Sequence, residues 1–102
     1  MITKRDIQRL NNNDGLTLKK YNTIVYRSGY QVATEGVEVK TVDECMRAIE
    51  QYNGNCGVWF SDGIYYVDKS KRVDTKRAAL HIGRLCNQIS VLKWANMSLI
   101  YC

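Results

Sequence analysis

Apolar side chains recur every three or four residues in two stretches of the chain, which is the spacing of an amphipathic helix. Before the first stretch, Thr41 and Glu44 have the form of a capping box, in which each side chain accepts a hydrogen bond from the other residue's amide. Asn53-Gly54 then predict the end of this helix, because both residues tolerate positive φ. Its apolar positions are Val42, Cys45, Met46, Ile49 and Tyr52.

The second predicted helix is capped by Asp74 or Thr75 and closed by Asn87. Two short strands are expected after it, at residues 89–94 and 98–101, because both segments are rich in β-prone residues. The inner stripe of the helix would consist of Ala79, Ile82, Gly83 and Cys86.

Residues 56–60 and 64–68 are two apolar, β-prone runs on either side of Ser61-Asp62-Gly63, and this pattern predicts a β-hairpin. Residues 30–34 are expected to form a further strand, which Val37 and Val39 could extend. The chain before them gives weaker signals. It indicates a short helix over residues 3–11 and a hairpin of residues 16–20 and 23–26 that turns at Tyr21-Asn22.

The expected element order from residue 29 onward is β-α-β-β-α-β, which is the order of the ferredoxin-like split βαβ motif. An offset of 34 positions aligns Gly29 with Gly63 and Asn53 with Asn87, so the core is interpreted as two diverged strand–helix–strand copies. We therefore predict a single α+β domain with two layers, in which two helices lie on one face of an antiparallel-rich sheet. Residues 29–102 form its core with a C-terminal strand, and residues 1–28 form an N-terminal helix and hairpin extension.

The length of 102 residues and a hydrophobic content of 45% are those of one globular domain. The net charge of +5 is unevenly distributed, because residues 1–62 are neutral and the excess falls within residues 63–102. A basic cluster of this kind attracts anionic partners. Most of the cluster is expected in the loop that leads into the second helix. The candidate anion- or partner-binding residues are Lys69, Lys71, Arg72, Lys76, Arg77 and Arg84.

Catalytic and metal-binding motifs are absent from the sequence. The single histidine, His81, lies inside the second predicted helix and is interpreted as a partly exposed helical residue. The four cysteines form no CxxC pair, which argues against a zinc site, and they are expected to be reduced. No apolar stretch is long enough to cross a bilayer, and no signal sequence is evident. A non-enzymatic, cytoplasmic protein without a cofactor is therefore expected.

Two kinds of partner remain open, an acidic protein surface and nucleic acid, and basic residues near aromatic ones suit both. Trp59, Tyr65 and Tyr66 are candidate interface anchors if they face outward, and the alternative is that they pack within the fold. Residues 57–60 and 64–67 are apolar on both faces of their strands. The second face would therefore be covered by the N-terminal extension, by another partner, or by a second copy in a homodimer.

Residues 52–59 and 89–94 resemble segments of small accessory proteins encoded by phages and mobile elements of Gram-positive bacteria. The resemblance is one of general sequence character over residues 29–102 and includes no diagnostic motif. It implies an anti-defence role, of which anti-CRISPR proteins are one type, exerted by binding and inhibiting a host protein or ribonucleoprotein complex such as a CRISPR nuclease in the bacterial cytoplasm. Because the chain is basic, mimicry of duplex DNA is disfavoured. The alternative function is that of a small nucleic-acid-binding accessory protein.

Overall fold

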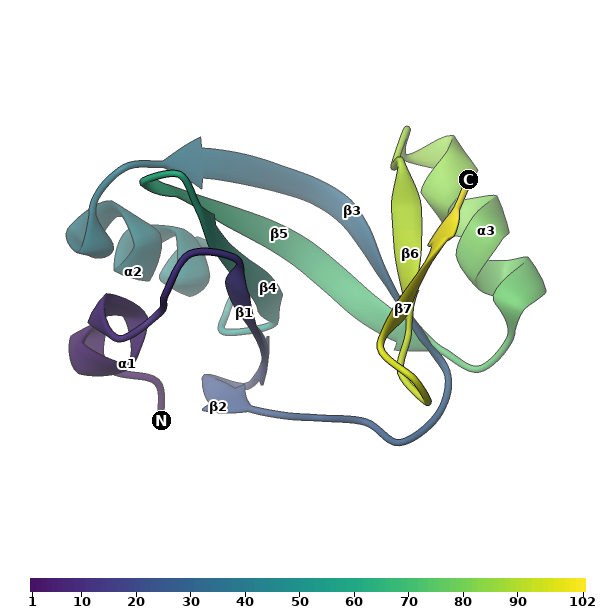
Figure 1. The fold of residues 1–102 in the computed structure, drawn as a ribbon, viewed down its shortest axis with the longest axis horizontal. Coiled ribbons are helices and arrows are strands. Elements are labelled where there is room, and N and C mark those ends of the chain that lie inside the picture. Colours follow the sequence, from purple (N-terminus) through teal and green to yellow (C-terminus); the bar gives the residue numbers. More distant parts are fainter. The chain divides into compact units, whose positions relative to one another are not determined.

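Seven strands and three helices make up the computed structural model, which describes residues 1–102 (Figure 1). The elements in chain order are α1 (Lys4–Gln8), β1 (Asp14–Lys19), β2 (Asn22–Thr23), β3 (Tyr30–Val39), α2 (Val42–Gln51), β4 (Cys56–Ser61), β5 (Ile64–Val73), α3 (Lys76–Leu85), β6 (Ser90–Lys93) and β7 (Ser98–Tyr101). The strand order is β2-β1-β4-β5-β3-β6-β7. Its four middle members, β4-β5-β3-β6, are in the ferredoxin-like order, so the predicted α+β class and element order are confirmed.

The chain forms two compact units that do not follow the chain order. Unit 1 consists of residues 1–24 and 36–69, and unit 2 consists of residues 25–35 and 70–102. The long strands β3 and β5 contribute residues to both units. Unit 1 therefore contains α1 and α2, and unit 2 contains α3 and the β6–β7 hairpin, and each unit has its own buried cluster.

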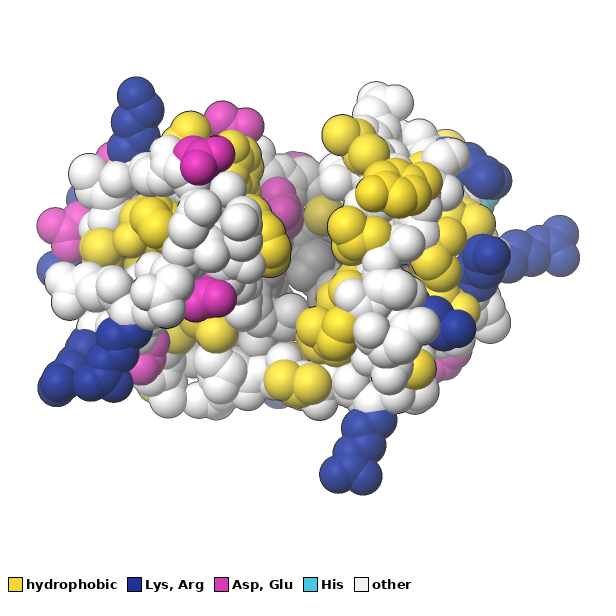
Figure 2. Space-filling model, viewed as in Figure 1, with side chains coloured by type: hydrophobic (Ala, Val, Ile, Leu, Met, Phe, Trp, Pro, Cys, Tyr) yellow, Lys and Arg dark blue, Asp and Glu magenta, His cyan; other side chains and the backbone are white.

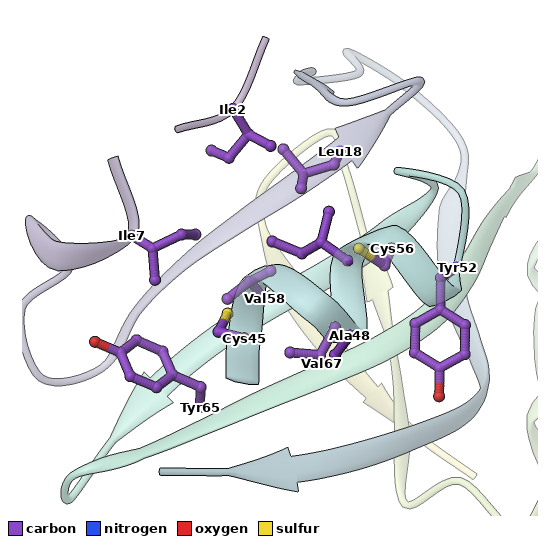
Figure 3. Close-up of a cluster of buried hydrophobic side chains, with 11 residues drawn as sticks. Ile2, Ile7, Leu18, Cys45, Ala48, Tyr52, Cys56, Val58, Tyr65 and Val67 are labelled. Atoms are coloured by element: carbon purple, nitrogen blue, oxygen red, sulfur yellow. The ribbon is translucent and has the colours of Figure 1, made fainter. Parts of the chain in front are cut away.

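The core of unit 1 lies between its strands and its two helices (Figure 3). Ile49 of α2, Val58 of β4 and Val67 of β5 are almost fully buried there. Ile2 and Ile7 join the same cluster, and α1 packs against α2. The N-terminal extension thus adds α1 to the helical layer of this unit and β1 to the edge of β4 in its sheet.

The core of unit 2 is smaller. Val32 of β3, Ala79 of α3 and Val91 of β6 are buried together, and partly buried apolar residues surround them. Gly83 lets α3 lie close to this cluster, because a Cβ there would be 2.8 Å from Cys102 Sγ and 3.2 Å from Val91 Cγ1. The predicted inner stripe of the second helix is thereby confirmed at Ala79 and Gly83.

Local signals placed most helix ends and turns correctly. Thr41 and Thr75 are the N-caps of α2 and α3, and each hydroxyl accepts a hydrogen bond from the amide three residues later, at 3.1 Å. The cap at Thr41 is not a full capping box, because the Glu44 carboxylate accepts a hydrogen bond from the Thr41 hydroxyl and not from the Thr41 amide. The predicted β4–β5 hairpin turns at Asp62-Gly63, where both residues have positive φ.

Several local predictions were wrong. The helix expected over residues 3–11 spans only Lys4–Gln8, and the strand expected over residues 23–26 is the two-residue β2. The β1–β2 hairpin turns at Lys20 and Tyr21 instead of Tyr21-Asn22, since both residues have positive φ and Lys19 pairs with Asn22. The second strand of the central hairpin does not stop at residue 68 but continues to Val73. Lys69, Lys71 and Arg72 therefore lie in a strand and not in a loop.

The four cysteines are all unpaired. Cys45 and Cys56 are buried in the core of unit 1, and burial raises the pKa of their thiols to about 11 and about 12. Both are protonated at neutral pH and pack as small apolar residues. None of the three helices has the length and apolar character needed to cross a membrane.

Candidate functional site

The two units differ sharply in charge. Unit 1 contains eight basic and eight acidic side chains, so its net charge is zero. Unit 2 contains seven basic residues and only two acidic ones, Glu35 and Asp74, so it carries the entire net charge of +5. The predicted charge asymmetry is therefore also a division between structural units, and any long-range attraction of anionic partners acts on unit 2.

The outer side of α3 is the most cationic element surface in unit 2. Arg77, His81 and Arg84 follow one another at intervals of four and three residues, which places them on one side of the helix. Together with Thr75 and Ala78, they line an open depression of about 460 Å³. We call these three side chains the α3 cationic stripe, after its two arginines. All three are exposed.

The local sequence explains why this stripe faces solvent. Ala79 and Gly83 are the buried positions of α3, and small residues there allow a close approach to the strands. With the inner side fixed in this way, Arg77, His81 and Arg84 point outward. No acidic side chain lies in the first turn of α3, so nothing on the helix itself neutralises the stripe.

The remaining basic candidates do not join the stripe as one patch. Lys69 belongs to unit 1, whereas Lys71 is an exposed residue in the part of β5 that belongs to unit 2. Lys76 is exposed at the first position of α3. Of the six predicted residues, Arg77 and Arg84 are the two that line the same depression.

Arg72 is occupied by contacts within unit 2. Its Nη1 donates to Asp74 Oδ1 at 2.6 Å, and its Nε and Nη2 donate to the carbonyl and hydroxyl of Ser28 at 3.0 and 3.2 Å. The guanidinium carbon also lies 5.3 Å from the centre of the Tyr26 ring, in cation–π geometry. The Tyr26 ring in turn packs edge-on against Trp94, at 5.5 Å between centroids. Arg72 therefore anchors residues 26–29 to the strand, and fewer of its donors remain for a partner.

Exposed apolar side chains accompany the charge of unit 2. Figure 2 shows apolar side chains along the β6–β7 hairpin, with basic ones nearby on the α3 side. β7 is the last strand in the sheet order, so one of its edges has no strand beside it. The exposed large apolar residues in this part of unit 2 are Leu85, Ile89, Met97, Leu99 and Tyr101.

The three candidate aromatic anchors separate onto two faces of unit 1. Tyr65 is 7% exposed and packs against Phe60 in the core, with 4.6 Å between ring centroids, so it does not face outward. Trp59 and Tyr66 form a directly opposed pair on β4 and β5. Because strand side chains alternate, this pair lies on the face away from α2. Trp59 is 45% exposed there.

Unit 1 has a depression of its own, about 550 Å³, between the N-terminal residues and α2. Charges of both signs line it, and Lys4 Nζ is paired with Asp43 Oδ1 at 2.7 Å. This ion pair is the first cause that holds the pKa of Asp43 below its usual value. The depression therefore does not present a single sign of charge to a ligand.

His81 and the exposed apolar residues of unit 2 were not expected from the sequence to form part of a binding surface. The spacing of Arg77, His81 and Arg84 was available as a signal for the stripe. The exposure of β7 was not, because it depends on which strand occupies the sheet edge. Compared with known proteins, the chain matches no protein family, and no curated protein or solved structure is significantly similar to it.

Proposed function

We propose that this chain is a non-enzymatic binding protein that attaches through unit 2 to an acidic surface of a partner protein. The observation that carries the proposal is that unit 2 combines the whole net charge with exposed apolar residues of α3, of β7 and of the segments on either side of β6. Charge attracts and orients a partner, and buried apolar and aromatic contacts supply most of the affinity. Leu99 and Tyr101 on the edge strand are suited to be such contacts.

The class of partner that we propose for unit 2 is a complex of the host's defence system. The resemblance to accessory proteins of phages and mobile elements supports a host defence complex, such as a CRISPR nuclease, as the target. Inhibition would then follow from occupation of an acidic surface that the complex needs for its activity. An acidic protein surface is complementary to unit 2, because unit 2 carries the entire net charge of +5.

The second candidate function is direct nucleic-acid binding, and the α3 cationic stripe favours it. Arg77 and Arg84 lie on the same side of α3, where they are able to contact phosphates of a nucleic-acid backbone. For binding of this kind, the logarithm of the binding constant falls linearly with the logarithm of the salt concentration. It would not require the exposed leucines, whereas binding to a protein would.

The test is a pull-down with tagged protein from a nuclease-treated host lysate. The variant Arg77→Glu/Arg84→Glu should lose a stoichiometric protein partner. The matched control Lys19→Glu/Lys40→Glu makes the same change in net charge with exposed residues of unit 1, and it should retain the partner. Equal loss in both variants would contradict a role for the α3 surface.

A second pair of measurements separates the two functions. Leu85→Ser/Leu99→Ser should abolish capture of the protein partner and leave fluorescence anisotropy with labelled DNA and RNA unchanged. If instead the wild-type protein binds only nucleic acid, with affinity that falls steeply with salt, the protein-binding proposal is wrong.

A further inference from the structure

The face of unit 1 that is turned away from α2 carries an acidic and aromatic group of side chains, separate from the surface of unit 2. The strand register places Gly15, Trp59 and Tyr66 in one row across β1, β4 and β5, and Thr17, Gly57 and Asp68 in the next. Alternation puts both rows on the same side, opposite Val58 and Val67 of the core. We call this group of six residues the open face of unit 1.

Two glycines shape the open face. A Cβ on Gly15 would be 2.9 Å from Trp59 Cε3, so the indole lies across Gly15. A Cβ on Gly36 would overlap with Asp68 Oδ1, so the carboxylate lies over Gly36 of the adjacent strand β3. The side chains of Trp59 and Asp68 are thus drawn to opposite sides of Gly57, and the floor between them has no side chain.

Asp68 has no partner of its own on this face. It takes part in no hydrogen bond or ion pair of the structure, and burial raises the pKa of its carboxyl group. The carboxylate is nevertheless partly exposed, beside the pair Trp59–Tyr66. A half-buried carboxylate without a donor is unfavourable for folding, and a basic partner placed beside it would offset that cost.

Unit 2 holds an arginine beside an aspartate and an aromatic ring, although the aspartate is exposed there. There the Arg72 guanidinium lies over Gly29, stacks on Tyr26 and is paired with Asp74. The open face of unit 1 has a glycine floor, an aromatic pair and an aspartate, and the basic residue that alternation places on the same side of β1 is the exposed Lys19, two residues beyond Thr17. Glu38, which alternates with Val37 and Val39 of the core, adds a second negative charge on the same side.

We propose that the open face of unit 1 binds an arginine side chain presented by a partner protein. The guanidinium pairs with the Asp68 carboxylate and stacks on Trp59 and Tyr66, in the way that Arg72 is held within unit 2. Carboxylates bind the planar guanidinium through two hydrogen bonds, and tryptophan is the strongest aromatic partner of a cation. This site is independent of the function proposed for unit 2, and failure of either leaves the other standing.

Nuclear magnetic resonance of the ¹⁵N-labelled full chain tests the proposal. The probe is the blocked peptide acetyl-Gly-Arg-Gly-amide, and the control peptide carries citrulline, which has the same shape without the charge. We expect the arginine peptide to shift the Trp59 indole resonance saturably at millimolar concentration. The Trp94 indole, which is buried and donates to Gln31, should not move.

Two variants complete the test. Asp68→Asn should weaken binding of the arginine peptide by about tenfold or more, because the charged acceptor is lost. Asp62→Asn makes the same change in the exposed β4–β5 turn and should leave binding unaltered. The proposal is overturned if the arginine peptide produces no saturable shift, if citrulline shifts Trp59 equally, or if Asp68→Asn binds as the wild type does.

Discussion

Asp68 opposes folding at neutral pH, because burial raises the pKa of its carboxyl group and no donor compensates for the lost water. A group with a raised folded-state pKa binds its proton more firmly in the folded state. Its unfavourable contribution is therefore complete above the folded pKa and fades as the pH falls through that value towards the unfolded one.

We expect Asp68→Asn to increase the free energy of unfolding at pH 7 by roughly 0.5 kcal/mol, a small gain because the carboxylate keeps part of its water. The increase should shrink as the pH is lowered, because protonation neutralises the wild-type side chain as well. Urea unfolding at pH 7 and at pH 4 measures both values. Asp62→Asn should change neither, and an Asp68→Asn protein less stable than the wild type at pH 7 would contradict this account.

At the scale of elements, two glycines in tight turns have the same backbone strain and different surroundings. Gly54 and Gly63 have φ values of 70° and 79°. A Cβ on Gly63 would meet no atom within 4 Å, whereas one on Gly54 would overlap with Tyr21 N and lie 2.6 Å from Tyr21 Cγ. Tyr21 N also donates to Gly54 O at 3.1 Å, so the turn after α2 is bonded to the β1–β2 turn.

Gly63→Ala should therefore cost about 1 kcal/mol of unfolding free energy, from the left-handed backbone alone. Gly54→Ala should cost about 2 kcal/mol more, because the β1–β2 turn must move to accept the methyl group. Denaturant unfolding of both variants measures the difference. Equal costs would show that the contact with Tyr21 contributes nothing to stability.

The elements that the sequence predicted well are those whose signals are local. The caps at Thr41 and Thr75 and the turn at Asp62-Gly63 each depend on a few adjacent residues, and all three are in place. Arg77 and Arg84 were likewise found as candidates from charge alone. Their common side of α3 follows from helical spacing once the helix is known.

The elements that the sequence missed depend on distant partners. Residues 69–73 have no apolar alternation, yet they continue β5, because the strand that lies beside them in the sheet order, β3, comes from much earlier in the chain. Tyr21 adopts φ of 66°, which is uncommon for an aromatic residue, next to the turn that contains Gly54. The open face of unit 1 depends on register, which places Asp68 opposite Gly57, and no single segment reveals it.

At the scale of the whole molecule, the two units differ in how much they bury. The cluster of unit 1 contains eleven buried residues and that of unit 2 contains three, with Trp94 buried separately. Burial of apolar surface is the main favourable term in folding, and regions with fewer buried contacts open at lower free energy. Unit 2 is therefore the part expected to open first.

We expect the amides of α3 and β6 to exchange with solvent through openings that cost roughly 2 kcal/mol less than those that expose α2 and β4. Hydrogen exchange at low denaturant concentrations measures these free energies residue by residue. If all four elements exchanged with the same free energy, the two units would form a single cooperative structure. A partner bound to unit 2 should slow exchange in α3, because ligands stabilise the state to which they bind.

The interleaved make-up of the two units has a consequence for synthesis on the ribosome. Every residue of unit 1 has been made once residue 69 is in place, whereas unit 2 joins residues 25–35 to residues 70–102. During translation, the first half of β3 must wait without its neighbours Ser90–Lys93 of β6 until that strand has emerged. Because domains form in the order in which they emerge, the neutral unit is set to fold first and the cationic unit last.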